Sequence, residues 1–280
     1  MSIDSILVGD CRETLKTITE RPRMCVTSPP YYGLRNYGDE ENQIGQEDTP
    51  EEYIQQLVEV FREVRNVLTD DGTLWVNIGD SYYNYRPGRG QGLVKQTVSN
   101  TKQDLPDVCP RRGNRLPGLK EKDLIGIPWM LAFALRADGW YLRQDIIWHK
   151  PNPMPESVRD RCTKSHEYIF LLSKSKKYFY NNEAIKEPAK DWGTRDRSKG
   201  KYHNEGTGLQ PHSGLEKSYT TKNKRSVWSV TNKPYKGSHF AVFPPDLIEP
   251  CILAGSEEGD IVLDPFMGSG TTAVVSKSLG

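Results

Sequence analysis

The sequence predicts an α/β fold, in which a parallel sheet packs against helices, and two observations indicate it. Short apolar runs of strand character alternate with stretches whose apolar positions recur at helical spacing, as in strand–helix–strand units. Near the end of the chain, residues 261–263 lead into a glycine-rich turn and a helix-forming stretch, as at the ligand-binding edge of doubly wound sheets. A chain of 280 residues is long enough for one large α/β domain with a substantial insertion, or for two small domains.

The first elements are short. Residues 5–11 are expected to form a strand that ends at a turn, and residues 12–18 a helical turn for which Asp10 is a suitable N-cap. The apolar run at residues 24–27 predicts the next strand.

A strand–helix–strand unit is completed further along the chain. Residues 51–68 carry an apolar stripe at helical spacing, and this helix begins at Thr49 or Pro50. A turn of two aspartates and a glycine then leads into a strand at residues 73–80.

The second half contains the remaining elements. A helix is expected at residues 124–136, where Pro128 is tolerable only near the first turn. Strands are expected at residues 141–148 and 167–173, joined by a proline-stiffened loop, and a further helix at residues 246–254.

Cysteine usage and hydropathy exclude several classes of protein. The five cysteines lack C-x-x-C spacing, so neither a disulfide framework nor a zinc site is expected, and no metal site is predicted. They indicate reduced thiols in a cytoplasmic protein. Neither a long apolar run nor an export leader occurs, so no membrane partner is predicted.

The net charge of +1 hides a strong asymmetry. Residues 86–122 carry nine Lys and Arg against three Asp and Glu, and residues 174–236 carry fifteen against six, which leaves about −14 for the remainder. Segregated basic charge indicates a polyanionic partner, although a solvated lysine-rich loop would give the same pattern.

The residues after the strand at 24–27 predict a reaction centre. Pro29 and Pro30 remove two N–H donors, so the strand must end at Ser28. The rigid corner presents a hydroxyl and carbonyls, and it ends in the aromatic rings of Tyr31 and Tyr32. Such groups can hold a flat base by its amino group, but an ordinary strand exit with a Pro-Pro turn is the alternative.

The turn after residues 261–263 predicts a ligand site of its own. Its acidic residue and glycines resemble neither a complete dinucleotide fingerprint, because a third glycine is missing, nor a P-loop, because no lysine follows the second glycine. An acidic strand end beside a phenylalanine suits a ligand with an amine and an adenosine ring. The residues concerned are Asp264, Pro265, Phe266, Gly268, Gly270 and Thr271.

Together the two stretches resemble the amino-DNA methyltransferases, which carry an S-P-P-Y or D-P-P-Y motif and a D-P-F-x-G-x-G motif. Their order here resembles the β-group of that family, a circular permutation of the usual arrangement. The resemblance implies a Rossmann-like methyltransferase sheet, circularly permuted, with a DNA-recognition insertion. It implies S-adenosyl-L-methionine as cofactor, bound at the second motif, and it implies catalytic roles for Ser28, Pro29, Pro30 and Tyr31.

The same resemblance implies further contacts and a domain division. Asp10 and Cys11 match an element that contacts the adenine end of the cofactor, with the N-cap role of Asp10 as the alternative, and His239 and Phe240 lie near its methionine part. Residues 1–183 and 237–280 are expected to form the catalytic domain, including a basic loop at 86–122, and residues 184–236 the target-recognition region. Residues 184–236 lack clear periodicity, and their composition suggests surface loops, with a disordered linker as the alternative. The aromatic residues that lie among their Lys and Arg suit nucleic acid; they are Trp192, Tyr202, Tyr219, Trp228 and Tyr235. The candidates for contacting double-stranded DNA are Arg86, Arg89, Arg111, Arg112, Lys150, Asn152, Arg195, Arg197 and Arg225.

The chain departs from the family in one respect. In the family two further strands follow the cofactor strand, and the first ends in an acidic residue that binds the ribose, whereas this sequence stops at Gly280. We therefore expect that the C-terminal strands are missing, because the chain is a fragment or because a partner supplies the edge.

The expected reaction is methylation of the exocyclic N4 of cytosine in duplex DNA, in a restriction–modification system with a cognate restriction endonuclease. The S-P-P-Y form favours cytosine, and N6 of adenine is the alternative. Methylation at carbon 5 of cytosine is rejected, because Pro250 and Cys251 lie in an apolar helix without that family's other motifs. A catalytically silent DNA-binding module is the alternative of a different class.

Overall fold

A mixed six-stranded sheet forms the centre of the molecule. The computed structural model describes residues 4–33, 43–83, 116, 118–189, 220–232 and 243–280. The sheet has the strand order β7-β3-β4-β2-β1-β8, and a separate two-stranded ribbon is formed by β5 and β6. The strands are β1 (Met24–Thr27), β2 (Thr73–Ile78), β3 (Tyr141–His149), β4 (His166–Ser173), β5 (Glu187–Pro188), β6 (Thr221–Lys222), β7 (Val227–Ser229) and β8 (Val262–Leu263).

One strand of the central sheet runs against all the others. β1 is parallel to both β2 and β8, and β3 is parallel to β7, whereas β4 is antiparallel to its neighbours β2 and β3. The carboxyl ends of β1, β2, β3 and β8 therefore share one edge of the sheet with the amino end of β4. Residues at these five strand ends can form a common site.

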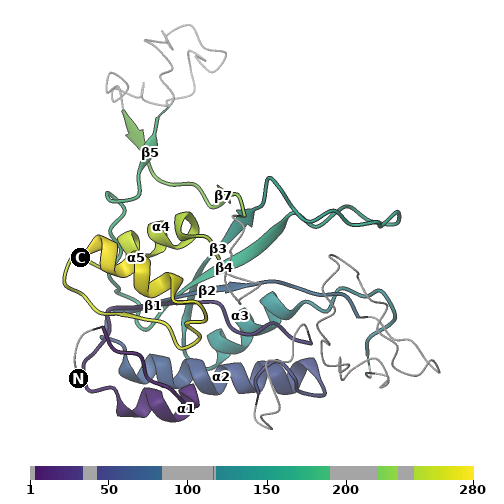
Figure 1. Ribbon diagram of the computed structural model, residues 1–280, viewed down its shortest axis with the longest axis horizontal. Coiled ribbons are helices and arrows are strands. Elements are labelled where there is room, and N and C mark those ends of the chain that lie inside the picture. The colour runs from purple at the N-terminus through teal and green to yellow at the C-terminus, as the bar shows by residue number, and fades with distance from the viewer. Residues whose placement is uncertain (1–3, 34–42, 84–115, 117, 190–219, 233–242) are drawn as a thin grey trace, which may run out of the picture.

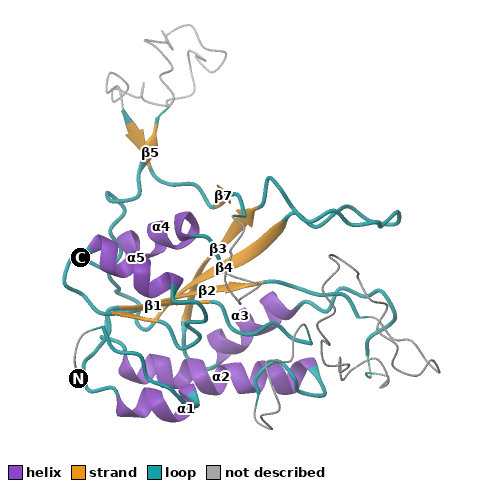
Figure 2. Ribbon diagram, in the orientation of Figure 1, coloured by secondary structure: helices purple, strands orange, loops and turns teal. Residues whose placement is uncertain are grey.

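Helices cover both faces of the sheet, as Figures 1 and 2 show: α1, α2 and α3 lie on one face, and α4 and α5 on the other. This is a three-layer α/β arrangement, as the alternation of patterns predicts. The helical segments are α1 (Cys11–Thr14), the 3-10 turn η1 (Leu15–Thr17), α2 (Pro50–Val67), α3 (Ile127–Ala137), α4 (Pro245–Gly255) and α5 (Thr271–Leu279).

The start of α2 follows from its sequence. Thr49 is the N-cap and forms a capping box with Glu52, while Pro50 occupies the first turn, where its missing N–H has no partner to lose. Pro128 likewise lies at the first turn of α3.

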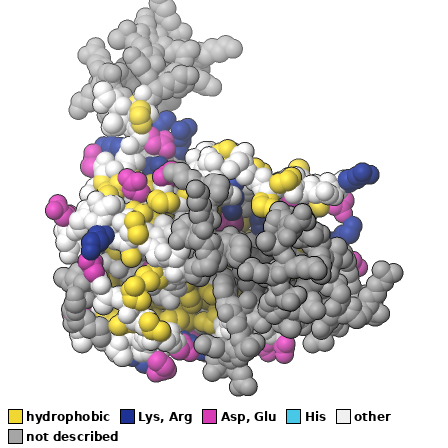
Figure 3. All heavy atoms as spheres, viewed as in Figure 1, with side chains coloured by type: hydrophobic (Ala, Val, Ile, Leu, Met, Phe, Trp, Pro, Cys, Tyr) yellow, Lys and Arg dark blue, Asp and Glu magenta, His cyan; other side chains and the backbone are white. Residues whose placement is uncertain are grey.

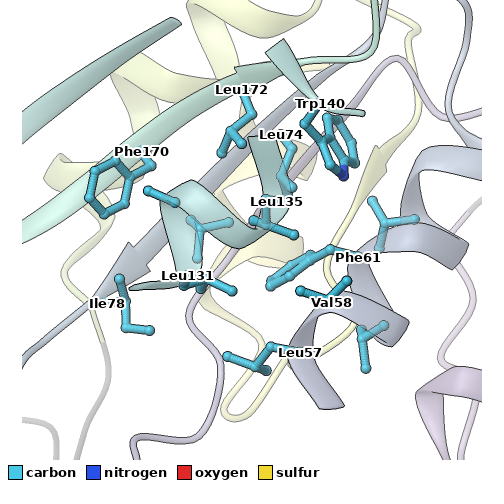
Figure 4. Packing of buried hydrophobic residues seen from close by; sticks show 14 of the residues in the cluster. Leu57, Val58, Phe61, Leu74, Ile78, Leu131, Leu135, Trp140, Phe170 and Leu172 are labelled. Atoms are coloured by element: carbon cyan, nitrogen blue, oxygen red, sulfur yellow. The ribbon is translucent and has the colours of Figure 1, made fainter. Parts of the chain in front are cut away.

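Two apolar cores lie on the two faces of the sheet. On β1, Cys25 packs into one core, whereas Met24 and Val26 pack into the other, because successive strand side chains point to opposite faces. Figure 4 shows the first core, in which α2 and α3 meet β2 and β4. Its labelled members are Leu57, Val58, Phe61, Leu74, Ile78, Leu131, Leu135, Trp140, Phe170 and Leu172.

Two details differ from the sequence-based expectation. The expected strand at residues 5–11 is wrong, because residues 4–10 are exposed and pair with no strand of the described chain. Conversely, β7 lies within the region expected to contain only surface loops, and the Trp228 ring is buried in the second core. Trp228 is therefore a core residue and not one of the DNA-facing aromatics that the sequence suggested. The division into two regions and the circular permutation stay predictions.

The connection between β3 and β4, residues 150–165, projects beyond the sheet (Figure 1). It is tied to the body of the protein by an ion pair between Lys122 and Asp160 of 2.7 Å, and by the Arg161 guanidinium, 4.0 Å from the centre of the Tyr82 ring. Basic and acidic side chains appear together toward its end in Figure 3. Among the helices that are described, none has the length and apolar character needed to cross a membrane.

Candidate active site

The two motifs predicted from the sequence meet at the shared edge of the sheet. The Pro-Pro stretch leaves the carboxyl end of β1, and the glycine-rich turn leaves the carboxyl end of its neighbour β8. A hydrogen bond of 2.5 Å from the Thr27 hydroxyl to the Asp264 carboxylate joins them directly. These two residues are 237 positions apart, so the fold builds one site from nearly opposite ends of the chain.

Asp264 organises the glycine-rich turn. Besides the bond from Thr27, its carboxylate accepts the Phe266 backbone N–H at 3.0 Å and the Thr272 hydroxyl at 2.6 Å. Burial raises the pKa of Asp264, and the three donors act in the opposite direction because they favour the ionised form. The carboxylate therefore links β1, the turn and the first turn of α5.

The glycines of the turn leave space above the backbone. Gly268 and Gly270 have φ of +53° and +83°, in the left-handed region that favours glycine. A Cβ at Gly270 would meet no atom within 4 Å, and one at Gly268 would meet only the Phe266 carbonyl at 3.9 Å. Ser269 and Thr271 hydroxyls lie 3.4 Å apart across the turn. Among the described residues, a ligand could therefore approach the turn closely.

Phe266 and Pro265 follow Asp264 on this turn. The Phe266 ring packs edge-on against Phe61 of α2, with centroids 6.4 Å apart. Both Phe266 and Pro265 are half-buried, so each still presents part of its surface.

The corner after β1 is held rigidly. Pro29 is buried and Ser28 is half-buried. The Pro30 carbonyl accepts the Tyr53 hydroxyl of α2 at 2.7 Å, so this carbonyl is already bound within the protein. Proline rings and this bond together fix the direction in which Ser28 and Tyr31 leave the sheet.

Tyr31 is fixed at both ends. Its hydroxyl donates to Glu167 at the amino end of β4, with 2.8 Å between the oxygens. Its ring lies against Gly79, where an added Cβ would stand 2.8 Å from the Tyr31 Cε2 atom. Burial, and then the charge of Glu167, raise the pKa of Tyr31 well above its ordinary value, while a hydrogen bond with Ser28 acts the other way. The phenol stays protonated and acts as a donor.

A half-buried ion pair lies next to the Tyr31 hydroxyl. Glu167 bonds to the Lys150 ammonium, and the two side chains are only 15% and 17% exposed. The same ammonium lies 4.1 Å from the centre of the Trp148 ring. Asn77 at the carboxyl half of β2 donates to the Tyr168 carbonyl at 3.1 Å, beside Glu167.

The structure gives Asp10 and Cys11 local roles. Asp10 is the N-cap of α1 and accepts the Arg12 backbone N–H at 2.9 Å, in addition to its ion pair with the Arg12 guanidinium. Cys11 packs partly against the first core, and burial raises the pKa of its thiol to about 11. The helix cap that the sequence left open for Asp10 is observed, and the contact of Asp10 with the adenine end of the cofactor stays a prediction.

Three of the DNA-contact candidates lie in the described chain, and each already has a partner. Lys150 pairs with Glu167. Asn152 exchanges two hydrogen bonds with the backbone of Asn232, of 3.0 and 3.2 Å. Arg225 is exposed and pairs with Glu187 at 3.0 Å. The other predicted DNA contacts lie outside the described ranges: Arg86, Arg89, Arg111, Arg112, Arg195 and Arg197. The predicted cofactor contacts His239 and Phe240 also lie outside them.

Several residues of the site were missed from the sequence. Thr27 and Thr272 are adjacent to predicted site residues, and their hydroxyls at a strand end and a helix start were an available signal. Gly79 and Glu167 gave no local signal, because their importance arises from contact with Tyr31, 48 and 136 positions away along the chain. Within the described ranges, no three His, Cys, Asp or Glu side chains are grouped so as to hold a metal ion.

Comparison with known proteins identifies the family. The N6_N4_Mtase family model, described as DNA methylase, matches residues 23–280. The Type II methyltransferase M.SmaI of Serratia marcescens is 51% identical over 275 residues, which cover 98% of this chain and 82% of that protein. The Type II methyltransferase M.XycI of Xanthomonas campestris pv. cyanopsidis is 47% identical over 272 residues, which cover 97% and 79%.

Solved structures share the fold at low sequence identity. The PvuII DNA methyltransferase (cytosine-N4-specific) matches with a TM-score of 0.61 and 17% identity, over 100% of this chain and 79% of that one. M1.HpyAVI in complex with SAM matches with a TM-score of 0.51 and 17% identity, over 97% and 86%. The predicted Rossmann-like methyltransferase sheet is thereby confirmed, and from the family match and the relatives together it follows that the chain belongs to the DNA methylase family.

Proposed function

We propose that the protein transfers a methyl group from S-adenosylmethionine to the exocyclic N4 of cytosine in double-stranded DNA, at a specific sequence and as part of a restriction–modification system. The observation that carries the proposal is the Thr27–Asp264 hydrogen bond, because it joins the start of the proposed base-binding corner, residues 28–31, to the glycine-rich turn. A transfer reaction requires that donor and acceptor sites be adjacent.

The glycine-rich turn fits the proposed cofactor. The open space above Gly268 and Gly270 allows a ligand to contact the backbone, and the half-buried Phe266 offers an aromatic surface. Asp264 uses its carboxylate oxygens within the protein, yet each oxygen has more than one lone pair and the group remains a centre of negative charge beside the turn. That charge suits the amine and sulfonium of S-adenosylmethionine. His239, Phe240, Asp10 and Cys11 stay proposed neighbours of the same ligand.

The base-binding corner fits an exocyclic amine. A base inside a duplex must first be flipped out, and Tyr31 offers its ring as a stacking face. The Ser28 hydroxyl and the Pro29 carbonyl then accept hydrogen bonds from the amine. These acceptors stabilise the positive charge that develops on the nitrogen as its lone pair bonds to the methyl carbon and the bond from that carbon to sulfur breaks. The methylated nitrogen then loses a proton to water. When bound, S-adenosylmethionine supplies an electrophilic methyl group, so a covalent enzyme intermediate is not needed.

Two observations support cytosine rather than adenine. Ser28 gives the motif its S-P-P-Y form, and the structural neighbour with a TM-score of 0.61 is described as cytosine-N4-specific. Restriction–modification is supported by M.SmaI and M.XycI, which are Type II methyltransferases. In this proposal residues 184–236 recognise the target sequence, and the basic loop at 86–122 contacts the phosphate backbone.

Methylation of mixed-sequence DNA followed by nucleoside mass analysis tests the proposal. The expected product is N4-methylcytosine, formed only when S-adenosylmethionine is present. N6-methyladenine as the sole product would show that the target base is adenine and not cytosine, and the reaction would still be methyl transfer to an exocyclic amine. DNA binding and cofactor binding without any methylated product would instead identify a catalytically silent DNA-binding module.

A further inference from the structure

We propose that Glu167, held by Lys150, is a positioning residue for the methyl transfer, and that it acts by fixing the Tyr31 ring before a base arrives. This inference rests on the proposed function, in which Tyr31 receives the flipped base. It also reassigns Lys150 from a DNA contact to a partner of Glu167.

The sheet places Glu167 where it can serve the corner after β1. β4 is antiparallel to β2 and β3, so its first residues lie at the edge where the other strands end. Backbone pairing holds the start of β4 on both sides, because Glu167 pairs with Trp148 of β3 and Tyr168 pairs with Ile78 of β2. Glu167 therefore extends from a rigid element and not from a loop.

Tyr31 depends on that carboxylate. Its hydroxyl donates to Glu167 at 2.8 Å, and hydrogen bonds to an ionised acceptor are stronger than neutral ones. Gly79 permits this arrangement, because a Cβ there would stand 2.8 Å from the Tyr31 ring and 3.4 Å from the Glu167 side chain. A ring ordered in advance loses less entropy when it captures a base.

Lys150 in turn orients the Glu167 carboxylate. Its backbone N–H donates to the Ser165 carbonyl at 2.7 Å, and its ammonium contacts both Glu167 and the Trp148 ring. Without this partner the half-buried Glu167 carboxylate would lose its counter-charge, which is unfavourable. If Lys150 instead bound a DNA phosphate, its ion pair with Glu167 would have to open.

The test compares single-turnover methyl transfer by wild-type protein with transfer by Glu167→Gln, Tyr31→Phe and the double variant. Glu167→Gln keeps the side-chain volume but removes the charge, and Tyr31→Phe keeps the ring and the Lys150–Glu167 pair but removes the hydroxyl. We expect each single variant to be slower by about ten-fold to a hundred-fold, with unchanged affinity for S-adenosylmethionine. The double variant should be no slower than the slower single variant, because both changes remove the same interaction.

Two further variants separate positioning from DNA contact. Lys150→Met should slow transfer without changing the salt dependence of DNA binding, and Lys150→Arg, which keeps the charge, should restore most of the rate. Asp70→Asn is the matched control, because it removes a carboxylate that is 84% exposed in an ion pair with Arg21, and it should leave the rate unchanged.

A fluorine resonance gives a measurement that does not depend on activity. With 3-fluorotyrosine at position 31, Glu167→Gln should shift and narrow the ¹⁹F signal of the free protein, because the ring gains motion. The inference is overturned if this signal is unchanged, if Glu167→Gln transfers at the wild-type rate, or if the two single effects multiply in the double variant. If wild-type protein methylates no DNA while the signal responds as expected, the proposed function fails and the positioning of Tyr31 stands.

Discussion

Thr27→Val tests the hydrogen bond that joins the two halves of the site. Valine has nearly the same shape as threonine, and position 27 is fully buried, so the change removes a hydroxyl without opening a cavity. The lost bond is 2.5 Å long and ends on the Asp264 carboxylate, which keeps two of its three donors. Hydrogen bonds to charged groups contribute roughly 1.5–3 kcal/mol, so the free energy of unfolding should fall by about 2 kcal/mol at neutral pH.

The pH dependence of this loss has a definite sign. Because burial raises the pKa of Asp264, the folded protein binds this proton more tightly than the unfolded chain does, and the contribution of Asp264 to stability declines as the pH rises through the folded value. Removing the Thr27 hydroxyl destabilises the ionised form of Asp264 and raises the pKa of Asp264 further. The loss in the free energy of unfolding that Thr27→Val causes should therefore be largest at neutral pH and smaller at about pH 4.

Thr73→Val is the matched control for this experiment. Thr73 is equally buried on the neighbouring strand β2, and its hydroxyl accepts the Trp75 indole N–H at 3.1 Å, which is a neutral pair. We expect a loss of about 1 kcal/mol, the same at both pH values, and no change in cofactor affinity.

Denaturant melts at the two pH values, with calorimetric titration of S-adenosylmethionine, measure all of these quantities. Thr27→Val should bind the cofactor more weakly than either wild type or Thr73→Val. Equal affinities in the three proteins, together with a stability deficit that does not depend on pH, would refute the role given to the Thr27–Asp264 bond.

Four further predictions concern single residues. Gly268→Val should abolish cofactor binding in a calorimetric titration, because its φ of +53° strains a branched residue and the side chain would enter the space proposed for the ligand; normal affinity would reject that assignment. Gly79→Ala should slow methyl transfer but spare cofactor binding, since the added Cβ displaces the Tyr31 ring, and a wild-type rate would contradict this. Ser28→Ala should lower turnover by about a hundred-fold or more with normal cofactor affinity, and full activity would overturn the mechanism. Arg111→Gln should lower the salt slope of DNA binding by about one unit, and an unchanged slope would make residue 111 part of a linker.

Much of the architecture was predictable because it follows from local patterns. Two prolines at residues 29 and 30 forced β1 to end, and the apolar spacing of residues 51–68 located α2 to within a residue at each end. The error at residues 5–11 has a physical cause, since an apolar run forms a strand only where a neighbouring strand offers hydrogen bonds, and within the described chain no strand lies beside these residues.

The interactions that complete the site were not predictable in the same way. Lys150 was expected to contact DNA because of the resemblance to the family, and only the antiparallel course of β4 brings Glu167 to it. Trp228 among basic residues resembled a stacking residue for DNA, yet its indole N–H donates to the Arg225 carbonyl at 2.7 Å and its ring fills the core. Such pairings depend on contacts between distant segments, which no local pattern records.

The position of β8 beside β1 has a consequence for protein synthesis. The chain emerges from the ribosome with its amino end first, so the corner at residues 28–31 emerges long before Asp264 does. β1 can pair with β2 early in synthesis, but on its other side it can pair with β8 only after more than 200 further residues have been added. A nascent or prematurely ended chain that lacks β8 therefore carries the corner proposed to bind the base, but it lacks the glycine-rich turn proposed to bind the methyl donor.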